Sequence, residues 1–246
     1  MTDKQTDLVG LTQDEIFQSL ILNNLITKKE KFRAKQIWHW IYHHGETSVN
    51  KMTTISNELR KEILKFYKVE RPLIKEHQLS KDGTQKWLIK LEDGNLIETV
   101  FIPEANRGTL CVSSQVGCTL NCKFCFTGTQ KLVRNLSTQE ILSQLLLARD
   151  QLSDWPNSNQ RKISNIVFMG MGEPLYNYDN VKRAALIMGD KEGLKLSTKR
   201  ITLSTSGIVP QILDWGNEVD SRLAISLHAT NDDLRNDIVP INKKYP

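Results

Sequence analysis

Four cysteines that lie within 15 residues of one another are the side chains in this sequence best suited to chemistry. Cys118, Cys122 and Cys125 form a C-x3-C-x2-C loop, and Cys111 precedes that loop by seven residues. A disulfide framework usually spreads its cysteines along the chain to tie distant segments together. Clustered thiols instead favour a metal or redox centre.

The number of thiols in the loop indicates which centre it holds. A structural zinc site takes four protein ligands, whereas the loop offers three, and Cys111 lies on the preceding predicted strand. A 4Fe-4S cluster takes one thiolate per iron, so three thiolates leave one iron open to another ligand. We therefore interpret Cys118, Cys122 and Cys125 as cluster ligands; a zinc site and incidental buried cysteines are the alternatives.

Glycines and one acid end a second predicted strand. In Val167-Phe-Met-Gly-Met-Gly-Glu173, Gly172 lets the backbone approach a ligand closely, and Glu173 can accept a hydrogen bond from an ammonium group. This chemistry would hold the amino-acid end of S-adenosylmethionine (SAM). A tight turn explains the same segment if it stands alone.

Two later strands end in further polar residues. Ser204 closes one strand within Ser204-Thr-Ser-Gly207, and Ser226-Leu227-His228 closes the next. Hydroxyl and imidazole groups at neighbouring strand ends suit contacts to ribose and carboxylate. A purely structural role for His228 is the alternative.

Alternating strands and helices must position these residues. The sequence predicts four short apolar strands, with a helix after the capping box Ser137-Thr-Gln-Glu140. This alternation predicts an α/β fold with a parallel sheet and a site at the carboxyl ends of its strands. The predicted strands span Leu110–Ser113, Ile163–Met169, Arg200–Ser204 and Arg222–Leu227.

The first part of the chain is predicted to be helical, with a capping box at Thr12-Gln-Asp-Glu15. Helical spacing predicts one buried stripe of Phe32, Gln36, Ile37, Trp40 and Ile41, and another of Leu59, Ile63 and Phe66. Two Asp-Gly turns predict antiparallel strands over residues 73–103, with Trp87, Ile89 and Leu91 on one face. We divide the chain into an N-terminal helical accessory domain (1–70), an antiparallel β-hairpin bridge (71–106) and a core (107–246).

Composition leaves the partner open. Hydrophobic residues make up 39% of the 246 residues, and the net charge is +5, which is compatible with RNA but does not require it. Basic residues before and within the second helix could contact an RNA backbone, or could form a solvated face with the nearby tryptophans in the core. These residues are Lys28, Lys29, Lys31, Arg33 and Lys35, near Trp38, His39 and His43.

Nothing in the sequence points to a membrane or to export. No run approaches the roughly 18 apolar residues of a membrane span, and the polar start MTDKQTDLVG lacks the pattern of a secretory signal. We expect a cytoplasmic protein, a monomer without a membrane partner.

Taken together, the motifs resemble one family. The segment from Cys111 to Cys125, followed by GMGEPL, TLSTSG, AISLHA and IVPINKKY, is similar to the RlmN family of dual-specificity RNA methyltransferases within the radical SAM superfamily. The resemblance runs from FRAKQIW to the last residue. It implies a partial (β/α) barrel that binds a 4Fe-4S cluster and SAM.

The resemblance also implies an activity. Members of the family methylate C2 of adenine in 23S rRNA and in tRNA beside the anticodon, through a methylated cysteine and a transient disulfide, with electrons from a donor such as flavodoxin or ferredoxin. By motif match Glu98 is the proton acceptor and Cys111 the second cysteine. Gly172, Glu173, Ser204 and Ser226 to His228 match SAM contacts. Taken alone, Glu98 would be a solvated strand carboxylate and Cys111 a small buried residue.

One departure and three alternatives accompany this reading. The family's methyl-carrying cysteine has no counterpart here, so we expect a C-terminally truncated chain with an incomplete barrel that cannot complete methyl transfer as written. A C8-methylating relative is one alternative, although its motif continues with alanine where this chain has Pro174. A zinc-stabilised RNA-binding module and an enzyme that places a radical on a partner protein are the others.

Overall fold

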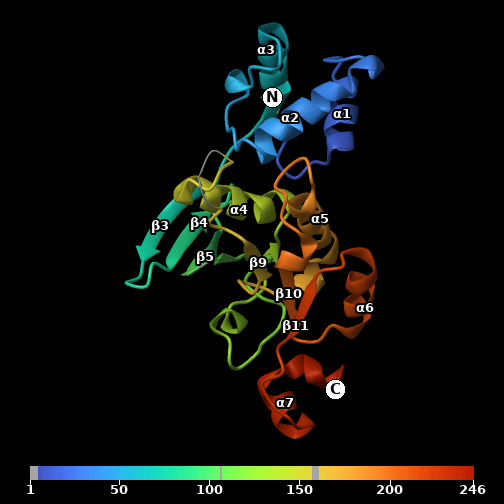
Figure 1. Cartoon of the computed structure of the whole chain (residues 1–246). Helices are drawn as coiled ribbons and strands as arrows, with labels where there is room; N and C mark the ends of the chain where they lie inside the picture. The colour runs from blue at the N-terminus through green and yellow to red at the C-terminus, as the bar shows by residue number, and fades with distance from the viewer. Residues whose placement is uncertain (1–4, 106, 157–160) are drawn as a thin grey trace.

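The computed structural model describes residues 5–105, 107–156 and 161–246, so residues 1–4, 106 and 157–160 of the three predicted parts lie outside it. One seven-stranded sheet organises the chain, in the order β11-β10-β9-β6-β5-β4-β3 (Figure 1). Its strands are β3 (Leu73–Leu79), β4 (Gln85–Lys90), β5 (Leu96–Glu104), β6 (Arg107–Cys111), β9 (Asn165–Phe168), β10 (Ile201–Thr205) and β11 (Arg222–Ile225).

The four later strands run parallel and confirm the predicted α/β class. β6 pairs with β9, β9 with β10, and β10 with β11, all in parallel. Helices occupy the connections, as βαβ units require. They are α4 (Thr138–Leu152), α5 (Tyr178–Gly189) and α6 (Val209–Glu218), followed by α7 (Asp232–Ile238) beyond β11.

The antiparallel strands continue the same sheet. β3, β4 and β5 pair in turn, and β5 pairs with β6, so the strands predicted as a bridge extend the parallel part. Trp87, Ile89 and Leu91 are all buried, as the alternation predicts. Gly83 and Gly94 close the two hairpins with φ of +84° and +86°, a conformation that costs glycine little.

The sheet has one helix-covered face and one open face. Leu110, Ile166 and Leu203 are fully buried, and Gln144 of α4 accepts a hydrogen bond from Thr99 of β5 at 2.8 Å. Alternate residues such as Glu98 and Cys111 point to the other face, because side chains alternate along a strand. The open face therefore carries the residues that are free to meet a ligand.

Three helices form the N-terminal part: α1 (Gln13–Leu22), α2 (Phe32–Tyr42) and α3 (Asn57–Phe66). A short parallel pair, β1 (Thr6–Asp7) and β2 (Tyr67–Lys68), ties its ends together. Both predicted capping boxes are present, at Thr12 with Glu15 and at Ser137 with Glu140. No helix in the described parts of the chain is long and apolar enough to span a bilayer.

The predicted stripe on α2 is confirmed at Ile37 and Ile41, whereas Phe32, Gln36 and Trp40 are not buried. Ala34, Ile37, Trp38, Ile41 and Tyr42 are the buried residues of α2. Phe32 is instead 51% exposed, Trp40 is half-buried, and in α3 Phe66 is 39% exposed, so the second stripe is only partly right. The physical reason is tertiary, since the α2 face packs on the core and the Trp38 indole N–H donates to Asp190 at 3.2 Å.

Candidate functional site

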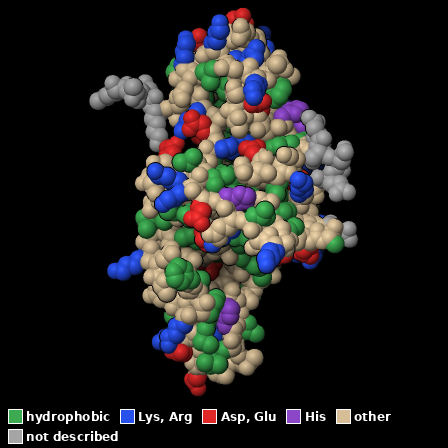
Figure 2. All heavy atoms as spheres, turned by 90° about the vertical axis from the view of Figure 1, so that its left-hand side faces the viewer, with side chains coloured by type: hydrophobic (Ala, Val, Ile, Leu, Met, Phe, Trp, Pro, Cys, Tyr) green, Lys and Arg blue, Asp and Glu red, His purple; other side chains and the backbone are tan. Residues whose placement is uncertain are grey.

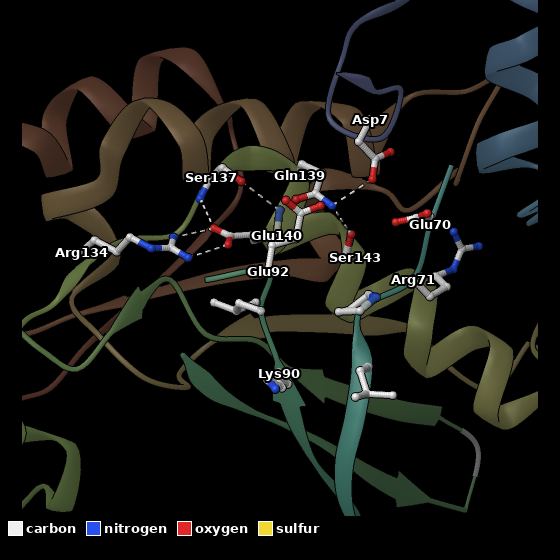
Figure 3. Close-up of a pocket in the computed structure, with 13 residues that line it drawn as sticks. Asp7, Glu70, Arg71, Lys90, Glu92, Arg134, Ser137, Gln139, Glu140 and Ser143 are labelled. Carbon is white, nitrogen blue, oxygen red and sulfur yellow. Dashed lines mark hydrogen bonds and ion pairs between the residues drawn. The ribbon is translucent and has the colours of Figure 1, made fainter. Parts of the chain in front are cut away.

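One sizeable cavity does not contain the cysteines. It measures about 530 Å³ and lies between β1, β3, β4 and the start of α4 (Figure 3). Several charged side chains around it are already satisfied: Arg134 pairs with Glu140 at 2.8 Å, and Gln139 donates to Asp7 at 3.2 Å. Arg71, also in its lining, pairs with Asp150 at 2.7 Å. At this cavity the contact between Asp7 and Gln139 joins the N-terminal part to α4.

A smaller cavity of about 270 Å³ brings the predicted site residues together at the carboxyl ends of the parallel strands. Figure 2 shows a hollow below the middle of the molecule, with hydrophobic side chains along part of its rim. The cavity lining includes eight predicted site residues: Cys118, Cys122, Cys125, Gly172, Glu173, Ser204, Ser226 and His228.

A small hairpin closes the cysteine loop. β7 (Gln115–Val116) pairs antiparallel with β8 (Arg134–Asn135), so the intervening residues form one loop beneath the strand ends. At its start Gly117 has φ +75°, and a Cβ there would lie 2.2 Å from the Lys131 carbonyl oxygen. Only glycine fits this position, and the chain turns sharply there to deliver Cys118.

The loop thiols sit in a protected environment. Cys122 is buried, and Cys118 and Cys125 are partly buried. Burial raises the pKa of the Cys118 and Cys122 thiols, with neighbouring cysteines and Glu173 adding to the effect. Bare thiolates are therefore disfavoured here, and a cation that binds them would offset that cost.

The loop fits an iron–sulfur cluster by its donor set. Three thiols line the described cavity, and the only other sulfur in its lining is the thioether of Met169. Across the described residues, no three His, Cys, Asp or Glu side chains gather closely enough for one metal ion. A cluster needs only one thiolate at each of its irons, so its ligands lie farther apart.

Gly172 and Glu173 form the opposite wall. Gly172 has φ +98°, and a Cβ there would approach the Gln115 Cβ to 2.5 Å. Glu173 is 3% exposed, and burial raises its pKa, although hydrogen bonds oppose the rise. Its carboxylate accepts from the Ser206 backbone N–H at 2.9 Å and the Leu175 N–H at 3.2 Å. The Thr205 side chain also hydrogen-bonds to this carboxylate, which leaves about one of its four lone pairs to accept from a ligand ammonium group.

His228 stands at the rim with the left-handed φ of +57°. Its ring stacks on Phe124 of the cysteine loop, with the centroids 3.6 Å apart. Ser204 and Ser226 line the cavity beside it, from the ends of β10 and β11. The aromatic pair therefore bridges the cysteine loop and the last strand end.

Three predicted residues lie outside this lining. Glu98 pairs with Lys86 at 3.1 Å on the open face of the sheet, and the side chain of Leu227 is 57% exposed. Cys111 lies opposite Val100 in the register, so it shares that face with Glu98. Burial raises the pKa of Cys111 to about 11, and a hydrogen bond from the Met169 backbone opposes the rise. All four cysteines are free thiols, so the structure gives the implied disulfide no support.

The basic residues of the N-terminal part divide into two groups. Lys31 pairs with Asp14 at 3.2 Å and Lys35 with Glu192 at 2.6 Å. Lys28 and Lys29 are exposed at the start of the segment. Trp38 belongs to the core, as the solvated-face interpretation expects, so only part of the basic group faces solvent without a described ion pair.

Sequence reasoning missed several residues of the site. Phe124 lies between two cluster cysteines, and Ser206 approaches Cys122 with its hydroxyl 3.9 Å from the sulfur. The quoted TLSTSG motif contained Ser206, but nothing in its spacing distinguished it from Ser204. Arg235, behind the strand ends, had no sequence signal because its role depends on tertiary contacts.

Comparison with known proteins identifies relatives of both parts. Residues 112–245 match the model of the radical SAM superfamily, and residues 6–69 match that of the ribosomal RNA large subunit methyltransferase N-terminal domain. The fold is also similar to a radical SAM methyltransferase from Sphaerobacter thermophilus, with a TM-score of 0.89 and 37% identity. That likeness covers 98% of this chain and 69% of the other.

Curated relatives carry the name dual-specificity RNA methyltransferase RlmN. The protein from Mesorhizobium japonicum is 54% identical over 99% of this chain and 63% of its own length. That from Rhodospirillum rubrum is also 54% identical, over 98% of this chain and 56% of its own length. The chain thus spans about 60% of the length of these relatives.

Proposed function

This chain belongs to the radical SAM superfamily, and we propose that it supplies the cluster- and SAM-binding part of an enzyme that methylates C2 of adenine in 23S rRNA and in tRNA beside the anticodon. One observation carries the proposal: three loop cysteines, Gly172 and Glu173 line a single cavity at the carboxyl ends of parallel strands. The similarity to proteins named dual-specificity RNA methyltransferase supports this choice of substrate.

Each wall of the cavity has its own task in this proposal. Cys118, Cys122 and Cys125 would hold a 4Fe-4S cluster through their thiolates, leaving one iron to SAM. When bound, the cluster and SAM supply the one-electron chemistry that activates an otherwise unreactive methyl group. Glu173 would accept from the SAM ammonium group, and Gly172 would let the backbone approach it.

The remaining strand ends would bind the rest of SAM. Ser204 and Ser226 offer hydroxyls to the ribose and the carboxylate, Leu227 offers its backbone, and His228 lies at the rim of the same cavity. The stack of His228 on Phe124 gives this end of the cavity a flat aromatic wall. Ser204 belongs to β10, and the other three residues follow the neighbouring strand β11.

The open face of the sheet would receive the nucleotide. C2 of adenine is electrophilic and has no lone pair with which to attack SAM, so a radical route is needed. Glu98 would accept the proton that leaves the base, and Cys111 would assist product release. Because both side chains share one face of neighbouring strands, one bound base can lie near both of them.

We also propose the binding partners and the division into domains. Exposed Lys28 and Lys29 would contact RNA phosphates, and a small donor such as flavodoxin or ferredoxin would supply electrons. We retain residues 1–70 as the RNA-contacting domain, 71–106 as the β extension and 107–246 as the core. The protein would act as a monomer in the cytoplasm.

Gene disruption in the source organism tests the activity. Digested 23S rRNA and tRNA from the disrupted strain should lack 2-methyladenosine by mass spectrometry, and the intact gene should restore it. A gene carrying Cys122→Ala should fail to restore it. Persistence of 2-methyladenosine, or loss of 8-methyladenosine instead, would overturn the proposal.

A further inference from the structure

Arg235 of α7 lies buried behind the cavity, with 8% of its surface exposed. Its guanidinium donates to the carbonyl oxygens of Ser206 at 2.9 Å, Ser226 at 3.2 Å and Leu227 at 3.0 Å. It also donates to the Asn242 side-chain oxygen. One side chain thus joins the ends of β10 and β11, the two strand ends that close the cavity.

The charge of Arg235 lacks a counter-charge among these partners. All four acceptors are neutral carbonyl or amide oxygens. Buried cations are usually paired with an acid, because removing a charge from water is unfavourable. Acids are connected to Arg235 through these partners and not directly, since Ser206 donates to Glu173 and Asn242 donates to Asp232.

Ser206 connects this charge to the loop. Its carbonyl accepts from Arg235, its N–H donates to Glu173 at 2.9 Å, and its hydroxyl lies 3.9 Å from the Cys122 sulfur. The Ser206 hydroxyl can therefore donate to this sulfur, and the Arg235 guanidinium lies behind the same residue. Both groups therefore favour negative charge on this sulfur.

We propose that Arg235 and Ser206 raise the reduction potential of the cluster held through Cys122, in addition to fixing the ends of β10 and β11. The inference rests on the proposed cluster. The reduced cluster carries one more negative charge than the oxidised one, so a nearby cation and a hydrogen bond to sulfur stabilise it. The added electron comes from an external one-electron reductant, which is oxidised in the same step.

Four variants separate charge, hydrogen bonding and general stability. Arg235→Met removes the charge, Arg235→Lys keeps it while breaking the fork, and Ser206→Ala removes only the hydroxyl. Arg161→Met is the matched control, because Arg161 also donates to three carbonyls, those of Ile163, Leu194 and Lys195, and does not line the cavity.

Each purified variant is reconstituted anaerobically, assayed for iron and sulfide, and titrated with dithionite while the reduced cluster is followed by electron paramagnetic resonance. We expect more negative midpoint potentials for Arg235→Met and Ser206→Ala, and wild-type values for Arg235→Lys and Arg161→Met. If Arg235→Met loses iron, the midpoint potentials of Ser206→Ala and Arg235→Lys decide the outcome.

Wild-type potentials in iron-replete Arg235→Met and Ser206→Ala would overturn the inference. An equal shift in Arg235→Lys and Arg235→Met would assign the effect to geometry and overturn the role of charge. A wild-type chain that binds the cluster but never cleaves SAM would instead contradict the proposed function, since the potentials would still be measurable.

Discussion

The backbone N–H of Ser206 donates to the buried carboxylate of Glu173 across 2.9 Å. This bond joins the end of β10 to the segment that follows β9, because the two residues belong to neighbouring strand ends. A carboxylate with a raised pKa is thereby held beside the cysteine loop. The hydrogen bond therefore links two walls of the cavity. Substitutions on different walls can be tested one at a time.

The cysteines should divide into three that bind the cluster and one that does not. Cys122→Ala should lose most of the iron and sulfide after anaerobic reconstitution, because three thiolates are needed to retain the cluster. Cys111→Ala is the control and should keep the wild-type iron content, since Cys111 does not line the cavity. Iron loss in Cys111→Ala but not in Cys122→Ala would refute the ligand assignment.

Substitution by alanine should lower the unfolding free energy more at Gly172 than at Gly94. Both have positive φ, so alanine should cost about 1–2 kcal/mol of unfolding free energy at either position. At Gly172 the new Cβ also meets Gln115 at 2.5 Å, whereas at Gly94 it meets nothing within 4 Å. Overpacking should add about 1–3 kcal/mol for Gly172→Ala.

Urea unfolding of both glycine variants measures this difference. Gly172→Ala should also weaken SAM binding in isothermal titration of the reconstituted protein, while Gly94→Ala should bind as the wild type does. Equal losses of stability in the two variants would show that the crowding at Gly172 has no cost.

Because of Asp7, the protein should be more stable at acidic pH than at neutral pH. Burial raises the pKa of Asp7 to about 6, above its ordinary value of 3.8. Its stabilising contribution is therefore complete below about pH 4 and is lost as the pH rises through 6, by up to about 3 kcal/mol. Asp7→Asn should lack this dependence.

The test for Asp7 is urea unfolding of both proteins at intervals from pH 4 to pH 7. The wild-type free energy of unfolding should fall relative to that of Asp7→Asn over this range. Parallel curves would mean that Asp7 titrates in the folded protein as it does in the unfolded chain.

Lys29 should contribute to RNA binding. Lys29→Glu should lower the affinity for a 23S rRNA fragment severalfold and make it less sensitive to salt, because a phosphate contact releases counterions. Lys199→Glu is the control, since Lys199 is already paired with Asp220 at 2.5 Å. Equal effects of the two substitutions in filter binding would argue against an RNA contact at Lys29.

Local signals made much of the fold predictable. The capping boxes at Thr12 and Ser137 depend on residues three positions apart, and the hairpins depend on Asp-Gly turns, so neighbouring residues suffice to specify them. The buried face of α2 was harder, since the contact of Trp38 with Asp190 joins residues 152 positions apart.

The same distinction separates the site residues that the sequence identified from those that it did not. Spacing identified the cysteine loop, and strand ends identified Gly172 and Glu173, because their chemistry is visible in residue types. Ser206 and Arg235 were not identifiable, since their roles arise from carbonyl positions and burial that only the folded chain creates. Which cavity holds the cysteines likewise required the structure.

Reductive cleavage of SAM tests the central claim most directly. The anaerobically reconstituted chain, supplied with SAM and dithionite, should release 5′-deoxyadenosine and methionine, detectable by liquid chromatography and mass spectrometry. The Cys122→Ala variant should release neither. A cluster-loaded wild-type chain that leaves SAM intact would contradict the account.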